Sequence, residues 1–187
     1  SDVTEEALEF MVILIAGDTH TGKTLLAQKL LEKYKYPYLS IDHLKMGLIR
    51  SGRCKLSAMS ADEELTAYLW PVVREIIKTC IDNSQNLIVE GCYIPFGWED
   101  DFTEAYVRQL KYICLILGEE YIKNHFCDIL RFENVIEKRL TADFSVEDLC
   151  LRNKYNLEQC RSRGYRYILI DKRYAINTDD ILCICFV

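Results

Sequence analysis

The fold of this chain is decided by the stretch Met11-Val12-Ile13-Leu14-Ile15-Ala16-Gly17-Asp18-Thr19-His20-Thr21-Gly22-Lys23-Thr24. An apolar run leads directly into the spacing G-x-x-x-x-G-K-T, and an amphipathic segment, residues 25–34, follows at once. Strand, loop and helix in this order are the context in which that spacing forms a phosphate-binding loop. Glycines let backbone N–H groups turn inward around a triphosphate, and the following helix presents its positive N-terminal end to the same anion. The stretch therefore predicts a site for a nucleoside triphosphate.

The residues of this loop have separable roles in the predicted site. The predicted nucleotide contacts are Gly17, Asp18, Thr19, His20, Thr21, Gly22, Lys23 and Thr24. Lys23 is expected to reach the terminal phosphates, and the Thr24 hydroxyl is expected to ligate Mg²⁺. The interpretation therefore includes two ligands, ATP and Mg²⁺.

The bulk composition limits the other classes of protein. The chain has 187 residues, which is the size of one domain, so we expect a single domain over residues 1–187. Its content of 50% hydrophobic and 28% charged residues is ordinary for a globular protein. The net charge of −6 argues against dedicated nucleic-acid binding, which usually needs a basic surface. No apolar run approaches the length of about 20 residues that crosses a bilayer, so no membrane partner is expected.

The cysteines and the amino-terminal segment bear on the cellular compartment. The chain contains 9 cysteines, scattered through mostly apolar segments, without the spacings of zinc ligands. Residues 1–9 are acidic and lack the basic and then apolar pattern of a signal peptide. We therefore expect reduced thiols and a cytoplasmic location, and the oligomeric state stays open.

Apolar runs and helical patterns alternate along the chain. Strands are predicted at residues 11–16, 36–41, 86–89, 112–117 and 167–170, and residues 181–187 form a further apolar segment. Helices are predicted at residues 23–33, 44–49, 60–83, 102–110, 119–140 and 146–161. The longest of them opens with Ser60-x-x-Glu63, the spacing of a capping box. The alternation predicts a three-layer α/β fold, with a five-stranded parallel sheet covered by helices on both faces.

Two carboxylates follow predicted strands on the same edge of this sheet. Asp42 comes after the second strand and Glu90 after the third. Ligands of open parallel sheets bind at the carboxyl ends of the strands, so both side chains are expected beside the triphosphate. Phosphoryl transfer needs one carboxylate to position and deprotonate the acceptor and another to hold Mg²⁺ or its waters. We therefore predict catalytic roles for Lys23, Asp42 and Glu90, with Thr24 and Glu90 as metal ligands.

With these motifs in place, the chain resembles the small-molecule kinases among the P-loop proteins, which include nucleoside and nucleotide kinases and shikimate and gluconate kinases. The resemblance rests on Gly17–Thr24, on Ser40-Ile41-Asp42 with Gly47–Arg50, on Leu87–Gly91 and on the arginine-bearing segment 131–152. It implies a P-loop NTPase fold with a helical lid after the fourth strand. It also implies ATP-dependent transfer of a phosphoryl group to a small-molecule acceptor.

The resemblance implies roles for particular residues as well. In such kinases the carboxylate after the second strand contacts the acceptor, which by position is Asp42. An arginine on the following helix often grips an anionic group of the substrate, and Arg50 matches that place, with Arg53 as its substitute. The candidates for a catalytic lid arginine, which closes on the transferring phosphate, are Arg139 as the preferred one and then Arg131 and Arg152.

Some features depart from the pattern of that group and leave alternatives open. The lid segment lacks a dense run of arginines, and Asp42 is followed by His43 and Lys45 rather than by a familiar specificity motif. The segment Val89–Pro95 is similar in outline to kinases of phosphorylated glycerates. The alternatives are therefore a kinase of a phosphoglycerate or sugar acid, and an ATP-binding sensor or interaction protein without turnover. Aromatic candidates for the wall of an acceptor pocket are Tyr68, Trp70, Tyr93, Phe96 and Trp98, although core packing is expected for most of them.

Overall fold

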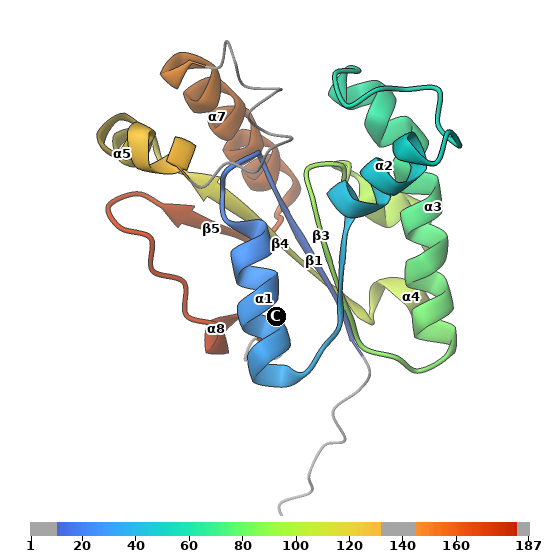
Figure 1. Ribbon diagram of the computed structural model, residues 1–187. Helices are drawn as coiled ribbons and strands as arrows, with labels where there is room; N and C mark the ends of the chain where they lie inside the picture. Colours follow the sequence, from blue (N-terminus) through green and yellow to red (C-terminus); the bar gives the residue numbers. More distant parts are fainter. Residues whose placement is uncertain (1–10, 132–144, 183–187) are drawn as a thin grey trace, which may run out of the picture.

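The computed structural model describes residues 11–131 and 145–182. Its centre is a parallel sheet of five strands in the order β2-β3-β1-β4-β5 (Figure 1). The strands are β1 Val12–Gly17, β2 Tyr38–Ser40, β3 Leu87–Glu90, β4 Leu110–Leu117 and β5 Tyr167–Ile170. The predicted five-stranded parallel sheet is therefore confirmed.

Helices connect these strands. They are α1 Lys23–Tyr34, α2 Ile41–Arg50, α3 Asp62–Asp82, the 3₁₀ helix η1 Trp98–Asp101, α4 Glu104–Val107, α5 Glu119–Arg131, α7 Val146–Arg163 and α8 Asp179–Leu182. Helix α3 continues through Pro71, and α5 bends at His125, whose φ is −124°. Among the described residues, no helix combines the length and apolar composition needed to cross a membrane.

The sheet is buried on both faces because alternate residues of β1 point to opposite sides. Val12, Leu14 and Ala16 pack in the cluster that contains the buried residues of α3. Ile13 and Ile15 pack in a second cluster, against α1 and α8. Figure 1 shows α1 lying across one face of the sheet, with α3 beside its other face. The three predicted layers are therefore present.

Three predicted local features are wrong, and each has a physical reason. Ile41 begins α2 rather than ending β2, so Asp42 lies in the first turn of a helix and not at a strand end. Residues 102–110 are not one helix, because Leu110 pairs with Val12 and begins β4. The capping box at Ser60 is absent: Ala61 is the N-cap of α3, and the Ser60 hydroxyl instead accepts a hydrogen bond from the Ser57 N–H at 3.0 Å.

Candidate active site

The predicted phosphate-binding loop connects β1 to α1. Gly22, with φ +83°, is the N-cap of α1, and no side chain caps this helix. Its first turn also contains no acidic residue. The N–H groups at the start of a helix have no partner within the helix, and together with the helix dipole they favour an anion. The loop therefore offers backbone donors of the kind that a phosphate group requires.

Lys23 is a buried cation near several carboxylates. Its side chain is 6% exposed, and its ammonium group donates to the Asp18 carbonyl at 2.5 Å. Burial alone would lower the pKa of Lys23, but Cys92, Glu90, Asp42 and Asp18 around it outweigh that effect and raise the pKa. Lys23 therefore keeps its charge in the buried site, as a lysine that meets phosphate must.

Thr24 and Glu90 lie together where a metal ion is predicted. The Thr24 hydroxyl donates to Glu90 Oε1 at 3.2 Å, whereas Glu90 Oε2 is buried and has no hydrogen-bond partner among the described residues. Mg²⁺ is usually bound through one or two carboxylates together with substrate phosphates and water. No group of three or more acidic, histidine or cysteine side chains that could hold a metal ion occurs in the described ranges. The residues present fit a Mg²⁺ ion that arrives with a nucleotide.

A close approach between α2 and β3 brings Asp42 to this site. Ser40, the last residue of β2, is the register partner of Glu90 in β3. A Cβ at Gly91 would lie 2.8 Å from the Ile41 Cβ, so only glycine lets the start of α2 pack this tightly. Asp42 follows Ile41 in the first turn of α2, and its side chain is 34% exposed. Gly91, directly after β3, therefore allows α2 to begin close to Glu90.

Lys45 belongs to the site, although the sequence reasoning did not assign it. It is 2% exposed, and its ammonium group donates to Asp42 Oδ1 at 2.6 Å and to the Tyr93 hydroxyl at 2.9 Å. Burial by itself lowers the pKa of Lys45, but the charge and hydrogen bond of Asp42 raise it overall. The spacing Asp-x-x-Lys places both side chains on one face of a helix and was the available signal.

Of the predicted lid arginines in the described ranges, Arg152 is the one that contacts the loop. Its guanidinium donates to Asp18 Oδ1 at 2.9 Å from Nε, and to Asp62 Oδ2 at 2.9 Å. It thus joins α7 to the loop and to the start of α3. Arg131, at the end of α5, is 77% exposed and pairs with Asp128. Arg139 lies outside the described residues, so its role stays a prediction.

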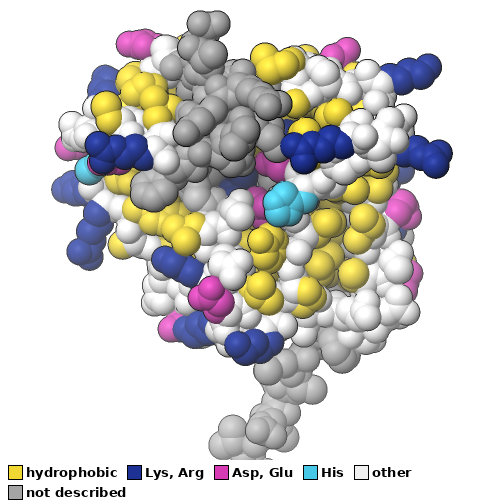
Figure 2. Space-filling model, in the orientation of Figure 1, with side chains coloured by type: hydrophobic (Ala, Val, Ile, Leu, Met, Phe, Trp, Pro, Cys, Tyr) yellow, Lys and Arg dark blue, Asp and Glu magenta, His cyan; other side chains and the backbone are white. Residues whose placement is uncertain are grey.

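The two arginines predicted to bind substrate lie at the end of α2 and just after it, in the segment that begins with Asp42. Arg50 is exposed in the last turn of α2, and Arg53 is exposed shortly after that helix ends. The Arg53 carbonyl accepts a hydrogen bond from the Tyr68 hydroxyl at 3.0 Å. Their predicted contact with a substrate stays a prediction. Figure 2 shows acidic side chains and a histidine gathered near the centre of this face.

The aromatic candidates mostly contribute to packing. Trp70, Tyr93 and Trp98 are buried in the core cluster that includes α3, and Phe96 stacks on Tyr165. Tyr93 differs from the others because its hydroxyl bonds Lys45 beside Asp42. Of this group, Tyr93 is therefore the residue that the structure joins to the site.

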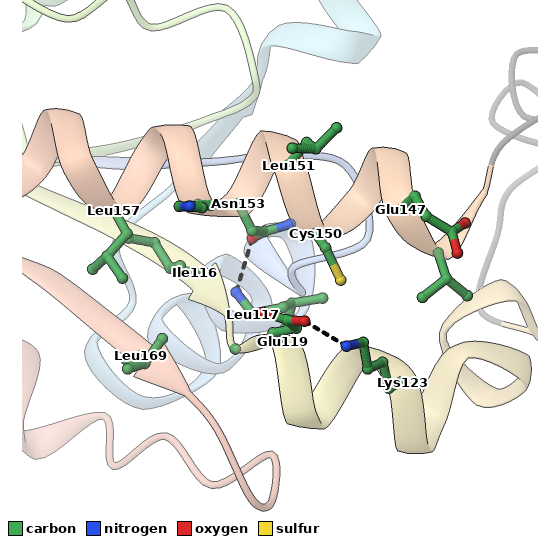
Figure 3. Close-up of a pocket in the computed structure, with 13 residues that line it drawn as sticks. Ile116, Leu117, Glu119, Lys123, Glu147, Cys150, Leu151, Asn153, Leu157 and Leu169 are labelled. Atoms are coloured by element: carbon green, nitrogen blue, oxygen red, sulfur yellow. Dashed lines mark hydrogen bonds and ion pairs between the residues drawn. The ribbon is translucent and has the colours of Figure 1, made fainter.

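A separate cavity of 540 Å³ opens between α5 and α7 at the ends of β4 and β5 (Figure 3). Its wall includes Cys150, Leu157 and Leu169, and Glu119 pairs with Lys123 at its edge. Asn153 faces it and accepts a hydrogen bond from the Leu117 N–H at 2.8 Å. None of the residues 17–24, Asp42 or Glu90 lines this cavity, so we assign it no part in the predicted chemistry.

Replacing Gly22 by alanine is expected to destabilise the protein by about 2–3 kcal/mol, because two separate costs combine. Gly22 has a left-handed φ of +83°, and an added Cβ would lie 2.0 Å from the Tyr174 hydroxyl oxygen. Gly52→Ala is the matched control, because φ there is +72° but nothing lies within 4 Å of the added carbon. Thermal unfolding should show a clearly larger loss of Tm for Gly22→Ala; equal losses would contradict the contact with Tyr174.

Comparison with known proteins is informative at the level of the fold. No model of a protein family matches the chain, and no curated protein matches it. Among solved structures, a protein from Chloroflexus aurantiacus provisionally described as a kinase is 19% identical, with a TM-score of 0.57, over 92% of this chain and 95% of that one.

Two further structures are similar. Shikimate kinase from Bacteroides thetaiotaomicron is 14% identical, with a TM-score of 0.51, over 86% of each chain. A sugar kinase from Janibacter is 15% identical, with a TM-score of 0.51, over 92% of this chain and 90% of that one. At such identities the likeness concerns the fold alone. The chain has the α/β fold of the P-loop small-molecule kinases.

Proposed function

We propose that the chain, as one domain over residues 1–187, is an ATP- and Mg²⁺-dependent kinase that phosphorylates a hydroxyl group of a small molecule. The observation that carries the proposal is the position of Asp42. Asp42 lies in the first turn of α2, and the packing of Ile41 against Gly91 brings that turn next to the end of β3, where Glu90 lies. The charge of Asp42 is also one of those that raise the pKa of Lys23. A carboxylate that is half-exposed beside a phosphate-binding lysine suits the binding of an acceptor hydroxyl.

The reaction is a displacement at the γ-phosphorus of ATP. The acceptor oxygen forms the new O–P bond while the bond from the γ-phosphorus to the bridging oxygen breaks, and ADP leaves. The acceptor proton passes to Asp42, which lies in the first turn of α2. Lys23 neutralises charge that develops on the phosphoryl oxygens, and the loop N–H groups hold the phosphates in place.

Bound Mg²⁺ would supply charge neutralisation at the β- and γ-phosphates. Thr24 and Glu90 are the residues that would hold it, because Glu90 Oε2 is a buried oxygen without a partner among the described residues. Arg152 is our proposed arginine for the phosphate side of the site, since its partner Asp18 is a loop residue. Arg50 and Arg53 are the proposed contacts for an anionic group on the acceptor.

The proposal is tested by measuring ADP formation with Mg·ATP and pooled acceptors: nucleosides, nucleotides, sugar acids, phosphoglycerates and other small polyols. We expect one pool to stimulate ADP formation, and we expect EDTA to abolish the stimulation. Binding of ATP, measured as a rise in Tm, provides the control for an intact nucleotide site. If ATP raises the Tm but no pool stimulates ADP formation, the chain is an ATP-binding sensor and not a kinase.

A further inference from the structure

Two cysteines meet inside the protein where α7 packs on β4. Cys114 lies in β4 and is 1% exposed, and Cys160 lies in α7 and is 0% exposed. Both belong to the core cluster that also contains the buried residues of α3. Neither side chain takes part in the chemistry proposed above.

Backbone hydrogen bonds hold the two cysteines next to each other. The Cys160 carbonyl accepts a hydrogen bond from the Tyr165 N–H at 2.8 Å, just beyond the end of α7. The carbonyl of the following residue, Arg166, accepts a hydrogen bond from the Cys114 N–H at 3.0 Å. Two hydrogen bonds and two adjacent residues therefore join the backbone of one cysteine to the backbone of the other, and this short connection fixes the end of the helix against the strand.

The two thiols are also in direct contact. A hydrogen bond with Cys114 is the main cause that lowers the pKa of Cys160, and the same contact, together with burial, raises the pKa of Cys114. The Cys114 thiol also donates to the Leu115 carbonyl at 3.9 Å, which is a weak contact. Because the thiolate is the reactive form of cysteine, Cys160 is the sulfur of the pair that reacts first.

We propose that Cys114 and Cys160 form a site of reversible oxidation, at which a peroxide converts the two thiols into a disulfide. The Cys160 thiolate attacks one oxygen of the peroxide, the O–O bond breaks, and Cys160 becomes a sulfenic acid. The Cys114 sulfur then attacks the Cys160 sulfur, the S–S bond forms, and water leaves. Two thiols and one hydrogen peroxide thus give one disulfide and two water molecules, with two electrons passing from sulfur to oxygen.

The geometry of the pair suits this reaction. Sulfur atoms in hydrogen-bonding contact are about 2 Å farther apart than bonded ones, whose distance is about 2.05 Å, so small side-chain rotations bring them together. Cys160 lies near the carboxyl end of α7, and helix ends open more readily than helix centres, which admits a molecule as small as hydrogen peroxide. The disulfide closes residues 114–160 into a covalent loop that contains α5 and most of α7. This inference does not depend on the proposed kinase function.

The first test maps the cross-link in the wild-type protein. Trypsin cleaves after lysine and arginine, so it places Cys114 in the peptide 112–123 and Cys160 in the peptide 155–161, and each peptide contains one cysteine. The folded protein is treated with hydrogen peroxide, the unreacted thiols are blocked with iodoacetamide in denaturant, and the digest is measured by mass spectrometry without reductant. We expect the two peptides to be joined, with the loss of two hydrogen atoms, and to separate after treatment with dithiothreitol.

The exposed thiol of Cys127 is the control for the action of the oxidant. The peroxide concentration is raised until Cys127 is oxidised. If Cys114 and Cys160 are then recovered with the alkyl group, or joined to other cysteines, the proposal is overturned. Treatment in urea is the matched control, because pairing in the unfolded chain should spread over its 9 cysteines. An equal yield of the joined peptides in the folded and the unfolded protein would show that the fold does not select this pair.

The second test measures the effect of the disulfide on stability. A cross-link over residues 114–160 restricts the unfolded chain, so we expect oxidation to raise the Tm by about 5–10 °C. Cys160→Ala should show no such rise. Cys150→Ala is the matched control, because Cys150 lies in the same helix but in the wall of the cavity in Figure 3, and this variant should keep the full rise.

Two results of the stability test would contradict the proposal. A rise in Tm that persists in Cys160→Ala would assign the effect of the oxidant to other residues. A fall in the Tm of the oxidised wild-type protein would show that the fold does not accommodate the bond. The peptide mapping needs no variant, so it decides the proposal independently of whether Cys160→Ala folds.

Discussion

Replacing Lys23 by alanine is expected to lower the rate of phosphoryl transfer about 10³-fold, which is the scale of a lost charge stabiliser in a transition state. Lys23 is 6% exposed and is surrounded by Asp18, Asp42 and Glu90. Without its ammonium group, these carboxylates would repel the phosphates of an entering nucleotide. The variant should therefore also lose most of the rise in Tm that ATP causes in the wild-type protein.

Lys29→Ala is the matched control for this experiment. Lys29 lies in the same helix, α1, and is exposed, so its replacement removes the same charge away from the loop. We expect the control to keep both the transfer rate and the stabilisation by ATP. A Lys23→Ala protein that is stabilised by ATP as strongly as the control would refute the assignment of the loop as a triphosphate site.

Replacing Asp42 by asparagine is expected to reduce transfer by about 10²–10⁴-fold while ATP binding is retained, since general bases contribute on this scale. Asparagine keeps the shape of the side chain and can still accept the hydrogen bond from Lys45, which spans 2.6 Å in the wild-type protein. What it loses is the ability to take a proton. The variant should therefore separate binding from chemistry in a way that Lys23→Ala does not.

The measurement for Asp42 combines two assays on the same sample. Steady-state transfer reports the chemistry, and the rise in Tm with Mg·ATP reports binding. Asp100→Asn serves as the control, because Asp100 is exposed in η1 and its replacement makes the same chemical change elsewhere. Wild-type transfer by Asp42→Asn would exclude Asp42 as the base.

The architecture could be predicted from sequence because buried parallel strands have a simple signature. The runs ILIA and LIV are continuously apolar and are covered on both faces of the sheet, so each could be assigned without knowledge of its neighbours. The exact residues at which strands and helices begin were harder to predict from the sequence. Leu110 joins β4 because Val12 pairs with it, and Ile41 starts α2 where Gly91 leaves space for it. Both depend on a partner distant in sequence.

The residues of the candidate site also differ in how well the sequence predicts them. The loop is contiguous and its spacing is specific, so its residues could be named from the sequence. Arg152 lies 134 residues from Asp18 in the chain, and only the crossing of α7 over the loop selects it from the other arginines. Lys45 was missed because Asp and Lys three residues apart are common on exposed helices. The burial of Lys45 beside Tyr93 distinguishes this pair, and a pattern along one helix does not reveal it.

The pairing of charges in the site has a consequence for how a nucleotide enters it. Within the part of the chain that the structure describes, three carboxylates of the site have cationic neighbours: Asp18 pairs with Arg152, Asp42 with Lys45, and Glu90 lies near Lys23. The described residues of the site are thus close to electroneutral together, so they hold little surplus positive charge for a polyphosphate. If the proposed function is right, we therefore expect a nucleotide to bind together with its counter-ion, and the magnesium complex of ATP to bind better than free ATP.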